Sequence, residues 1–292
     1  MPNVITTETR RTPGLPVALG GVVGLLLLNS LTVQLATAWQ IQVTVGALAT
    51  VSLVGLAWAC RHRFHRSATD LLLTLAAVSV FGWVSAALTA LPPVESWLGT
   101  APVPLAFLAV NAIKLSSLAA LAVVAYRRRW SRQRLLVRVG DLNVPSGIPF
   151  LRWGILGPVV IVAVLFLFLA DPAVTANFTS DTVTLLLTWA PVMLAGAAVN
   201  AVCEELLYRH ALITTAQPLF GTAVAVTVSC FVFGIGHITG SPGGWLGVLS
   251  TAVYGAVCAA AMVQNRGMAW NFLIHLFGDL GAVSALLIAT SA

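Results

Sequence analysis

Hydrophobic positions in this chain form long, nearly uninterrupted runs. Short stretches that are polar or contain proline or glycine separate these runs. A run of about 20 apolar residues is what an α-helix needs to cross the hydrocarbon core of a bilayer. The pattern predicts nine membrane-spanning helices, or eight if one segment re-enters the membrane, and therefore an all-α, polytopic transmembrane helix bundle. The predicted spans are residues 16–37, 41–60, 70–91, 102–126, 153–170, 182–208, 219–238, 245–263 and 268–290.

Composition agrees with this pattern. Hydrophobic residues make up 59% of the chain and charged residues 8%, whereas ordinary soluble domains carry about 25% charged residues. The first apolar run is not followed by an Ala-x-Ala-type cleavage site, and a second apolar run begins almost at once. We therefore interpret the first run as a membrane anchor rather than a secretory signal peptide. The cysteines lack a Cys-x-x-Cys pair and lie in or beside apolar runs, which is typical of small core residues. They are Cys60, Cys203, Cys230 and Cys258.

Basic residues collect in the loops on one side of the predicted bundle. Thirteen of the fifteen lie there, while Lys114 and Arg209 lie within spans. The opposite loops carry Glu95, Asp171 and Asp181 and no basic residue. The positive-inside rule therefore predicts a cytoplasmic N-terminus and an extracytoplasmic C-terminus. The thirteen are Arg10, Arg11, Arg61, Arg63, Arg66, Arg127, Arg128, Arg129, Arg132, Arg134, Arg138, Arg152 and Arg266.

An arginine-rich stretch divides the chain into three predicted regions. Residues 1–126 form a four-span membrane region, residues 127–152 a cytoplasmic connector, and residues 153–292 a second membrane region. We expect the connector to be amphipathic and to lie on anionic lipid, with a regulatory or partner-binding role as the alternative. Because the basic residues flank spans, the pI near 9.8 does not indicate nucleic-acid binding. The chain has fourteen arginines and one lysine and is rich in Ala, Val, Leu and Gly, which is typical of a bacterium with a high-GC genome. We therefore expect the protein to lie in a bacterial plasma membrane.

Two adjacent carboxylates, Glu204 and Glu205, end the sixth predicted span. A carboxylate in hydrocarbon is costly, so a pair of them needs an explanation. On a helix, Glu205 and Arg209 share one face and can pair, while Glu204 points about 100° away. We therefore interpret Glu205 as structural and Glu204 as the group that faces a cavity. The alternative is that all three form an ion cluster that stabilises the helix near the cytoplasmic interface.

The later spans carry further ionisable groups. His237 ends an apolar run, where a histidine is either an interfacial residue or a functional one. His275 and Asp279 share a helix face at a spacing of four, and such a pair can hold a metal, orient a water or bind an oxyanion. A hydrogen-bonded pair between helices is the structural alternative. The chain contains no His-Glu-x-x-His zinc-protease motif.

Three motifs occur in order on successive apolar segments: Glu204-Glu-x-x-x-Arg209, Phe233-x-x-x-His237 and His275-x-x-x-Asp279. Together they resemble the CPBP family, which comprises CaaX proteases and bacteriocin-processing enzymes and is also called the Abi family. The resemblance covers roughly residues 180–290. It implies an intramembrane endopeptidase that cleaves a membrane-associated protein or peptide substrate within the lipid bilayer.

The resemblance also implies roles for single residues. Glu204 and His237 would activate the hydrolytic water, and His275 and Asp279 would stabilise an oxyanion or bind a metal. All four would then surround a divalent ion, with Zn²⁺ the best fit to carboxylate and imidazole ligands. Family accounts leave a glutamate mechanism without metal equally open.

Two positions depart from the family pattern. His210 stands where a glycine commonly follows the arginine, and Asp279 stands where asparagine is more frequent. An ionised aspartate cannot donate to an oxyanion, so Asp279 either binds a cation or is protonated, and this favours the metal version slightly.

Simple helix geometry does not by itself bring the two histidines together. His275 lies about seven residues, or about 10 Å, along its helix from the cytoplasmic turn at Asn265-Arg266. His237 lies about sixteen residues, or about 24 Å, past Gly221 if that helix is straight. A tilted helix, an interface helix around Ala211–Gln217 or a re-entrant stretch at 240–244 would reconcile these depths. A catalytically idle immunity or scaffold protein of the same family, and an ion-coupled transporter, remain the alternative functions.

Overall fold

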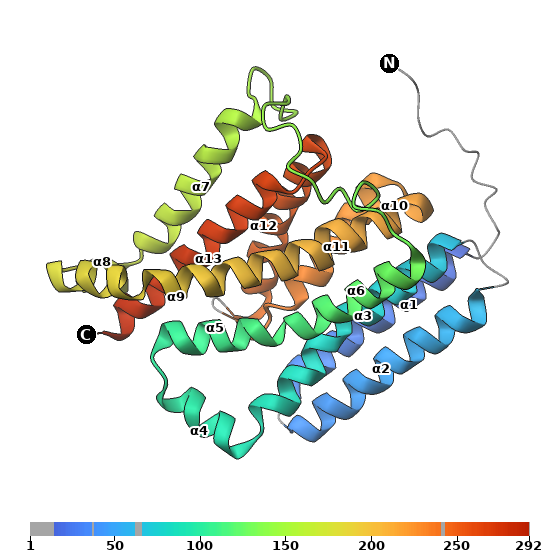
Figure 1. The fold of residues 1–292 in the computed structure, drawn as a ribbon, viewed down its shortest axis with the longest axis horizontal. Helices are drawn as coiled ribbons and strands as arrows, with labels where there is room; N and C mark the ends of the chain where they lie inside the picture. The colour runs from blue at the N-terminus through green and yellow to red at the C-terminus, as the bar shows by residue number, and fades with distance from the viewer. Residues whose placement is uncertain (1–14, 37, 62–65, 241–242, 292) are drawn as a thin grey trace.

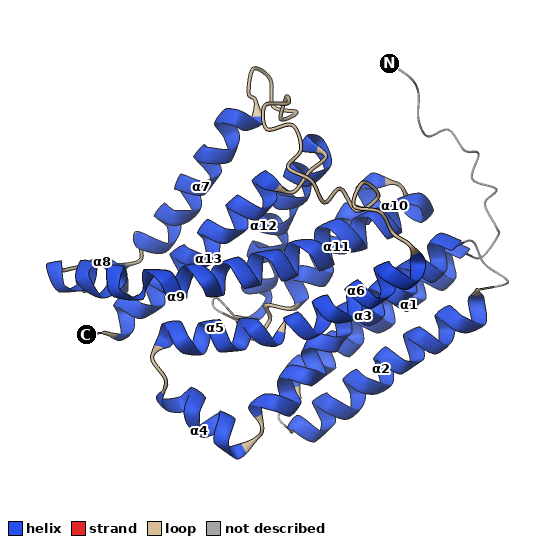
Figure 2. Ribbon diagram, in the orientation of Figure 1, coloured by secondary structure: helices blue, strands red, loops and turns tan. Residues whose placement is uncertain are grey.

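The computed structural model describes residues 15–36, 38–61, 66–240 and 243–291, and these residues form helices and no β-strand (Figures 1 and 2). The predicted all-α helix bundle is confirmed. Arg10, Arg11 and Arg63 lie outside the described residues. The helices are α1 (Leu15–Leu35), α2 (Trp39–Cys60), α3 (Arg66–Thr89), α4 (Pro92–Thr100), α5 (Val103–Ile113), α6 (Leu115–Arg128), α7 (Trp153–Leu169), α8 (Pro172–Ala176), α9 (Ser180–Glu204), the π-helix η1 (Glu205–Ile213), α10 (Thr214–Phe220), α11 (Thr222–Ile235), α12 (Gly244–Asn265) and α13 (Ala269–Thr290).

Each of the nine predicted spans corresponds to helical structure. Seven helical segments of the described residues are long and apolar enough to cross a membrane, whereas α7 and α11 are shorter apolar helices of 17 and 14 residues. The chain is therefore a multi-pass membrane protein, and the number of crossings stays a prediction. The predicted span at 102–126 is divided into α5 and α6, which meet at Lys114.

The glutamate-bearing segment is longer than predicted. Helix α9 continues through η1 and α10 as one helical stretch from Ser180 to Phe220, so residues 211–217 continue that stretch instead of forming a separate interface helix. A π-helix has a wider turn than an α-helix and is found frequently at functional sites. The stretch ends at Gly221, whose φ of +80° is readily adopted by glycine.

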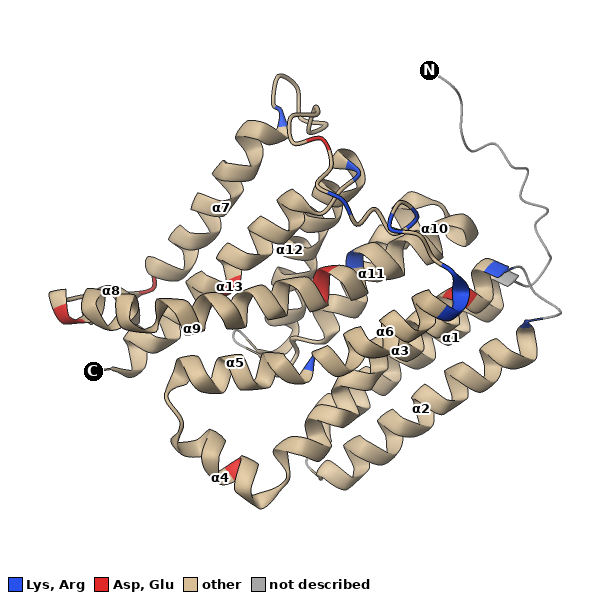
Figure 3. Ribbon diagram, viewed as in Figure 1, with Lys and Arg blue, Asp and Glu red and all other residues tan. Residues whose placement is uncertain are grey.

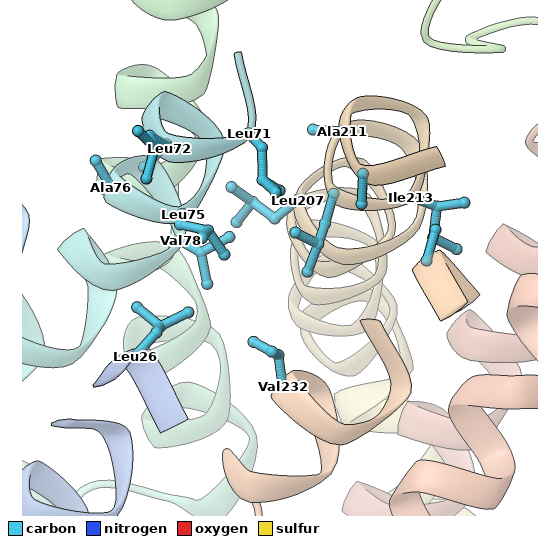
Figure 4. Packing of buried hydrophobic residues seen from close by; sticks show 14 of the residues in the cluster. Leu26, Leu71, Leu72, Leu75, Ala76, Val78, Leu207, Ala211, Ile213 and Val232 are labelled. Atoms are coloured by element: carbon cyan, nitrogen blue, oxygen red, sulfur yellow. The ribbon is translucent and has the colours of Figure 1, made fainter. Parts of the chain in front are cut away.

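The N-terminal helices pack directly on the π-helix. Figure 4 shows Leu71 and Leu75 of α3 facing Leu207 and Ala211 of η1, and all four are at most 4% exposed. Helix α9 packs between α5 and α13, and α11 lies along α12. The two membrane regions thus share one core around the segment that carries the glutamates. The four cysteines are free and buried, as expected for core residues.

The connector is a loop that protein contacts hold in place. The Met268 amide donates to the Arg138 carbonyl at 2.7 Å, and the Trp270 indole donates to the Leu142 carbonyl at 2.9 Å. Gly140, with φ of +86°, packs against Gly267, where a Cβ atom on either residue would collide with backbone. The α12–α13 turn therefore binds this backbone, and the expected contact of the connector with anionic lipid stays a prediction.

A second set of contacts ties the connector to the N-terminal helices. Arg128 and Arg134 donate to the two carboxylate oxygens of Asp70, at 2.5 Å and 2.7 Å. Asp70 is 1% exposed, so these arginines neutralise a charge that would otherwise be buried alone. The connector is thereby anchored to α3 at one end and to α12–α13 at the other.

Charge separates the two ends of the described bundle. Figure 3 shows the loop basic residues gathered around the connector, the start of α3 and the α12–α13 turn, with acidic residues of α4, of the turn before α8 and of the start of α9 at the opposite end. We therefore expect a C-terminal alkaline phosphatase fusion to be active and a C-terminal green fluorescent protein fusion to be dark, because the C-terminus faces away from the basic loops. A fluorescent, phosphatase-negative C-terminus would contradict this orientation.

Candidate active site

The adjacent glutamates lie at the junction of α9 and η1, and both are buried. Glu205 is 0% exposed, and its Oε1 lies 3.6 Å from Nε of Arg209, which is also 0% exposed. The Arg209 guanidinium stands over the Phe233 ring, 4.0 Å from its centroid, and its nitrogens have no hydrogen-bond partner. Arg209 is therefore held by Glu205 and by a cation–π contact.

His275 lies between the two carboxylates. Its Nδ1 lies 2.6 Å from Oε1 of Glu205, and its Nε2 lies 3.2 Å from Oε2 of Glu204 and 3.8 Å from Oδ2 of Asp279. Carboxylate oxygens accept hydrogen bonds, so Nδ1 donates to Glu205, while Oε2 of Glu204 is buried without a hydrogen-bond partner among the described residues. His275 therefore lies against both glutamates and is hydrogen-bonded to Glu205.

His237 reaches the same region from the end of α11. Its Nδ1 donates to the Phe233 carbonyl at 3.1 Å, which leaves Nε2 as the free nitrogen of the neutral ring. The His237 and His275 rings lie 4.8 Å and 6.0 Å from the Phe233 ring, measured between centroids. The two histidines therefore converge on one phenylalanine, although the spacing along straight helices did not show it.

Three polar residues without a place in the sequence motifs complete the network. Asn200 donates to Oδ2 of Asp279 at 2.8 Å. Lys114, at the α5–α6 break, donates from Nζ to Oδ1 of Asn200 and to Oε1 of Glu204. The available signals were the presence of one lysine inside an apolar span and the i,i+4 spacing of Asn200 and Glu204.

On the connector side, the third of these residues, Asn271, extends the network. Its amide donates to Oε2 of Glu205 at 2.7 Å and lies 3.2 Å from Nε2 of His210. His210 in turn donates from Nδ1 to the Leu135 carbonyl of the connector at 2.6 Å. The histidine that departs from the family pattern thus joins the connector to the buried glutamate.

A cavity of about 410 Å³ opens beside this network. Lys114, Glu204 and His237 line it together with residues of α1, α2 and α3. The side-chain amides of Asn29 and Gln34 on α1 belong to its wall, and an oxygen of each is buried without a hydrogen-bond partner. The N-terminal helices therefore build much of the space into which the buried carboxylate faces.

The expected metal-ligand set does not form in this arrangement. Among the residues that the structure describes, no three His, Cys, Asp or Glu side chains are grouped to hold a metal ion. The Lys114 ammonium already lies against Oε1 of Glu204 and neutralises its charge. The side chains present therefore do not fit a divalent ion held by Glu204, His237, His275 and Asp279.

Comparison with known families bears on these residues directly. Residues 186–281 match the family described as type II CAAX prenyl endopeptidase Rce1-like. This segment is therefore similar to the family that the three motifs indicated. The match includes both glutamates, Arg209, both site histidines and Asp279, and it excludes Lys114 and helices α1–α3. No curated protein and no solved structure matches the chain.

The predicted resemblance is thus confirmed over the segment from α9 to α13. The matched family is one of CAAX-type endopeptidases, so the similarity to proteases is at the level of the family and of residues 186–281.

Proposed function

We propose that this protein is an intramembrane endopeptidase that hydrolyses a peptide bond in a membrane-associated protein or peptide. The observation that carries the proposal is the Glu204 carboxylate, which is buried, accepts a hydrogen bond from Lys114 and lines a cavity that His237 also lines. A buried carboxylate with defined partners and access to a cavity is suited to act as a general base.

In this mechanism Glu204 takes a proton from a water molecule in the cavity, and the free Nε2 of His237 accepts a hydrogen bond from the same water. The water oxygen attacks the carbonyl carbon, and Glu204 then passes its proton to the leaving nitrogen. Lys114 donates to Glu204, and His275, which is hydrogen-bonded to Glu205, lies against the other Glu204 oxygen, so the orientation of the base depends on buried polar partners.

The division of the chain supports a division of labour. We propose that residues 153–292 supply the catalytic groups, that residues 1–126 supply the opposite wall of the cavity, and that the connector at 127–152 joins them. We further propose a bacterial plasma membrane with the basic loops in the cytoplasm. The substrate would then be a membrane peptide, lipoprotein or membrane protein.

Cleavage by the purified protein tests this proposal. Wild-type protein in detergent micelles, incubated with a labelled pool of membrane peptides, should yield defined fragments that the Glu204→Ala variant does not produce. An idle scaffold protein would cleave nothing, and an ion-coupled transporter would instead move ions across proteoliposomes independently of any peptide cleavage.

The Asp279→Asn variant, combined with chelation, tests the role of metal. Asp279 accepts a hydrogen bond from Asn200 and the described side chains do not group around an ion, so we expect Asp279→Asn to retain most of its activity and strong chelators to leave cleavage unchanged. The measurement is the cleavage rate with and without 1,10-phenanthroline. Reversible loss of cleavage on chelation, restored by Zn²⁺ and weakened in Asp279→Asn, would establish the metal version instead.

A further inference from the structure

Lys114 is the only lysine in the chain, and it lies inside a membrane span. Helix α5 ends at Ile113 and α6 begins at Leu115, so the lysine occupies the break between them. A cationic side chain within the hydrocarbon region is costly, and in membrane proteins it usually marks a functional site. Its position outside the residues that match the family leaves its role unassigned.

The contacts of Lys114 account for two of its three hydrogen-bond donors. Its Nζ donates to Glu204 and to Asn200, and the ammonium stands 5.4 Å from the centroid of the Phe81 ring. An ammonium group carries three donors, so one remains for a ligand. The Lys114 side chain is 15% exposed and lines the cavity, so this donor can reach a molecule bound there.

The other donors of the network do not face the cavity. His275 is 2% exposed and is absent from the cavity wall, and both of its nitrogens face carboxylates. Asp279 does not line the cavity either, and its Oδ2 accepts from Asn200. Arg209 is fully buried over Phe233. Among the described residues that line the cavity, Lys114 is the only lysine or arginine.

We propose that the Lys114 ammonium forms the oxyanion-binding site of this enzyme and binds the carbonyl oxygen of the scissile peptide bond. The inference rests on the proposed peptidase function and deepens it. The ligand is an amide carbonyl of a peptide in the cavity, with Glu204 and the ammonium on the same wall. A fixed cation beside the general base stabilises negative charge where it develops in the transition state.

The chemical step balances without another reactant. Water loses a proton to Glu204, its oxygen bonds to the carbonyl carbon, and the carbonyl electron pair moves onto oxygen. The ammonium donates a hydrogen bond to this oxyanion and keeps its proton. The C–N bond then breaks as the carbonyl re-forms, and Glu204 returns its proton to the leaving nitrogen. Lys114 thus supplies positive charge at the position where other hydrolases use a metal ion.

Steady-state kinetics of the purified full-length chain test this role, with a peptide that wild-type protein cleaves as the probe. Lys114→Met should lower kcat by about 10²–10³-fold with little change in KM, since removing one oxyanion donor has an effect of that size. Lys114→Arg should recover part of kcat because it keeps the charge. Arg127→Met is the matched control, because it changes an exposed basic residue of helix α6, which begins directly after Lys114. It should leave kcat unchanged.

Inhibitor binding separates this role from a structural one. A peptide phosphinate, which carries a tetrahedral anion at the scissile position, should bind Lys114→Met about 100-fold more weakly than wild type. The same peptide with CH₂–CH₂ in place of the scissile CO–NH has no oxygen there and should bind both proteins equally. If Lys114→Met does not fold, as judged by circular dichroism and size-exclusion chromatography, Lys114→Gln takes its place in both assays.

The possible results of these assays distinguish the role of Lys114 from the peptidase function itself. A Lys114→Met variant with kcat within about threefold of wild type, or faster, overturns the inference alone and leaves the peptidase function standing. Equal weakening of the phosphinate and the CH₂–CH₂ peptide also overturns it, because a purely structural lysine affects both. A wild-type protein that cleaves no peptide overturns the proposed function and this inference together.

Discussion

Replacing Glu204 by glutamine should abolish cleavage while leaving the protein folded and inserted in the membrane. Glutamine has nearly the same volume, and its amide oxygen can still accept a hydrogen bond from Lys114. The amide cannot take a proton from water, and general-base catalysis typically contributes about 10²–10⁴-fold to a rate. We therefore expect kcat to fall by that factor at least, measured on purified protein with a cleaved membrane peptide.

The matched control is Glu95→Gln, the same substitution on the exposed helix α4 at the other end of the bundle. It should leave kcat unchanged. Thermal unfolding and size-exclusion profiles of Glu204→Gln should match those of the wild type. A fully active Glu204→Gln, together with a stable but inactive Glu205→Gln, would show that the roles of the two glutamates are reversed.

Hydrophobic runs predicted most of the fold because a helix must present apolar side chains along a length that matches the bilayer. They could not show that the span at 102–126 breaks at Lys114. They also could not show that α9 continues through a π-helix to Phe220. Both features depend on tertiary contacts, namely the pairing of Lys114 with Glu204 and the packing of Leu207 and Ala211 on α3.

The motifs identified the candidate site residues, but not how these residues meet. Straight helices placed the two histidines about 14 Å apart in depth. In the structure α11 is short, and Gly234 lies so close to α12 that a Cβ atom would be 2.5 Å from the Val248 carbonyl oxygen. This close packing helps place Phe233 and His237 beside His275.

The residues that sequence reasoning left without a role share a physical feature. Lys114, Asn200 and Asn271 act through partners that are more than 60 positions away in the chain. No periodicity within one helix predicts such pairs. Asn271, His275 and Asp279 do follow one another at intervals of four residues, so α13 presents all three on one face.

Replacing Glu205 by glutamine should lower protein yield and stability as well as activity. Its two carboxylate oxygens accept from His275 and Asn271 at 2.6 Å and 2.7 Å, and its charge lies 3.6 Å from the Arg209 guanidinium. Glutamine would leave Arg209 buried without a counter-charge and would place an amide N–H₂ against a donor of either Asn271 or His275. Breaking a buried ion pair on one side typically costs about 3–5 kcal/mol.

We therefore expect a lower midpoint of thermal unfolding and less protein in the membrane fraction for Glu205→Gln than for Glu204→Gln, even though the two residues are adjacent. Glu95→Gln again serves as the reference for the same chemical change at an exposed position. The reason for the contrast is that Lys114 and Glu204 line the cavity, with side chains 15% and 9% exposed, whereas Arg209 and Glu205 are both 0% exposed, so only Arg209 would be left fully buried without its counter-charge. Equal yield and equal thermal midpoints for the two variants would show that Phe233 alone is sufficient to hold the arginine.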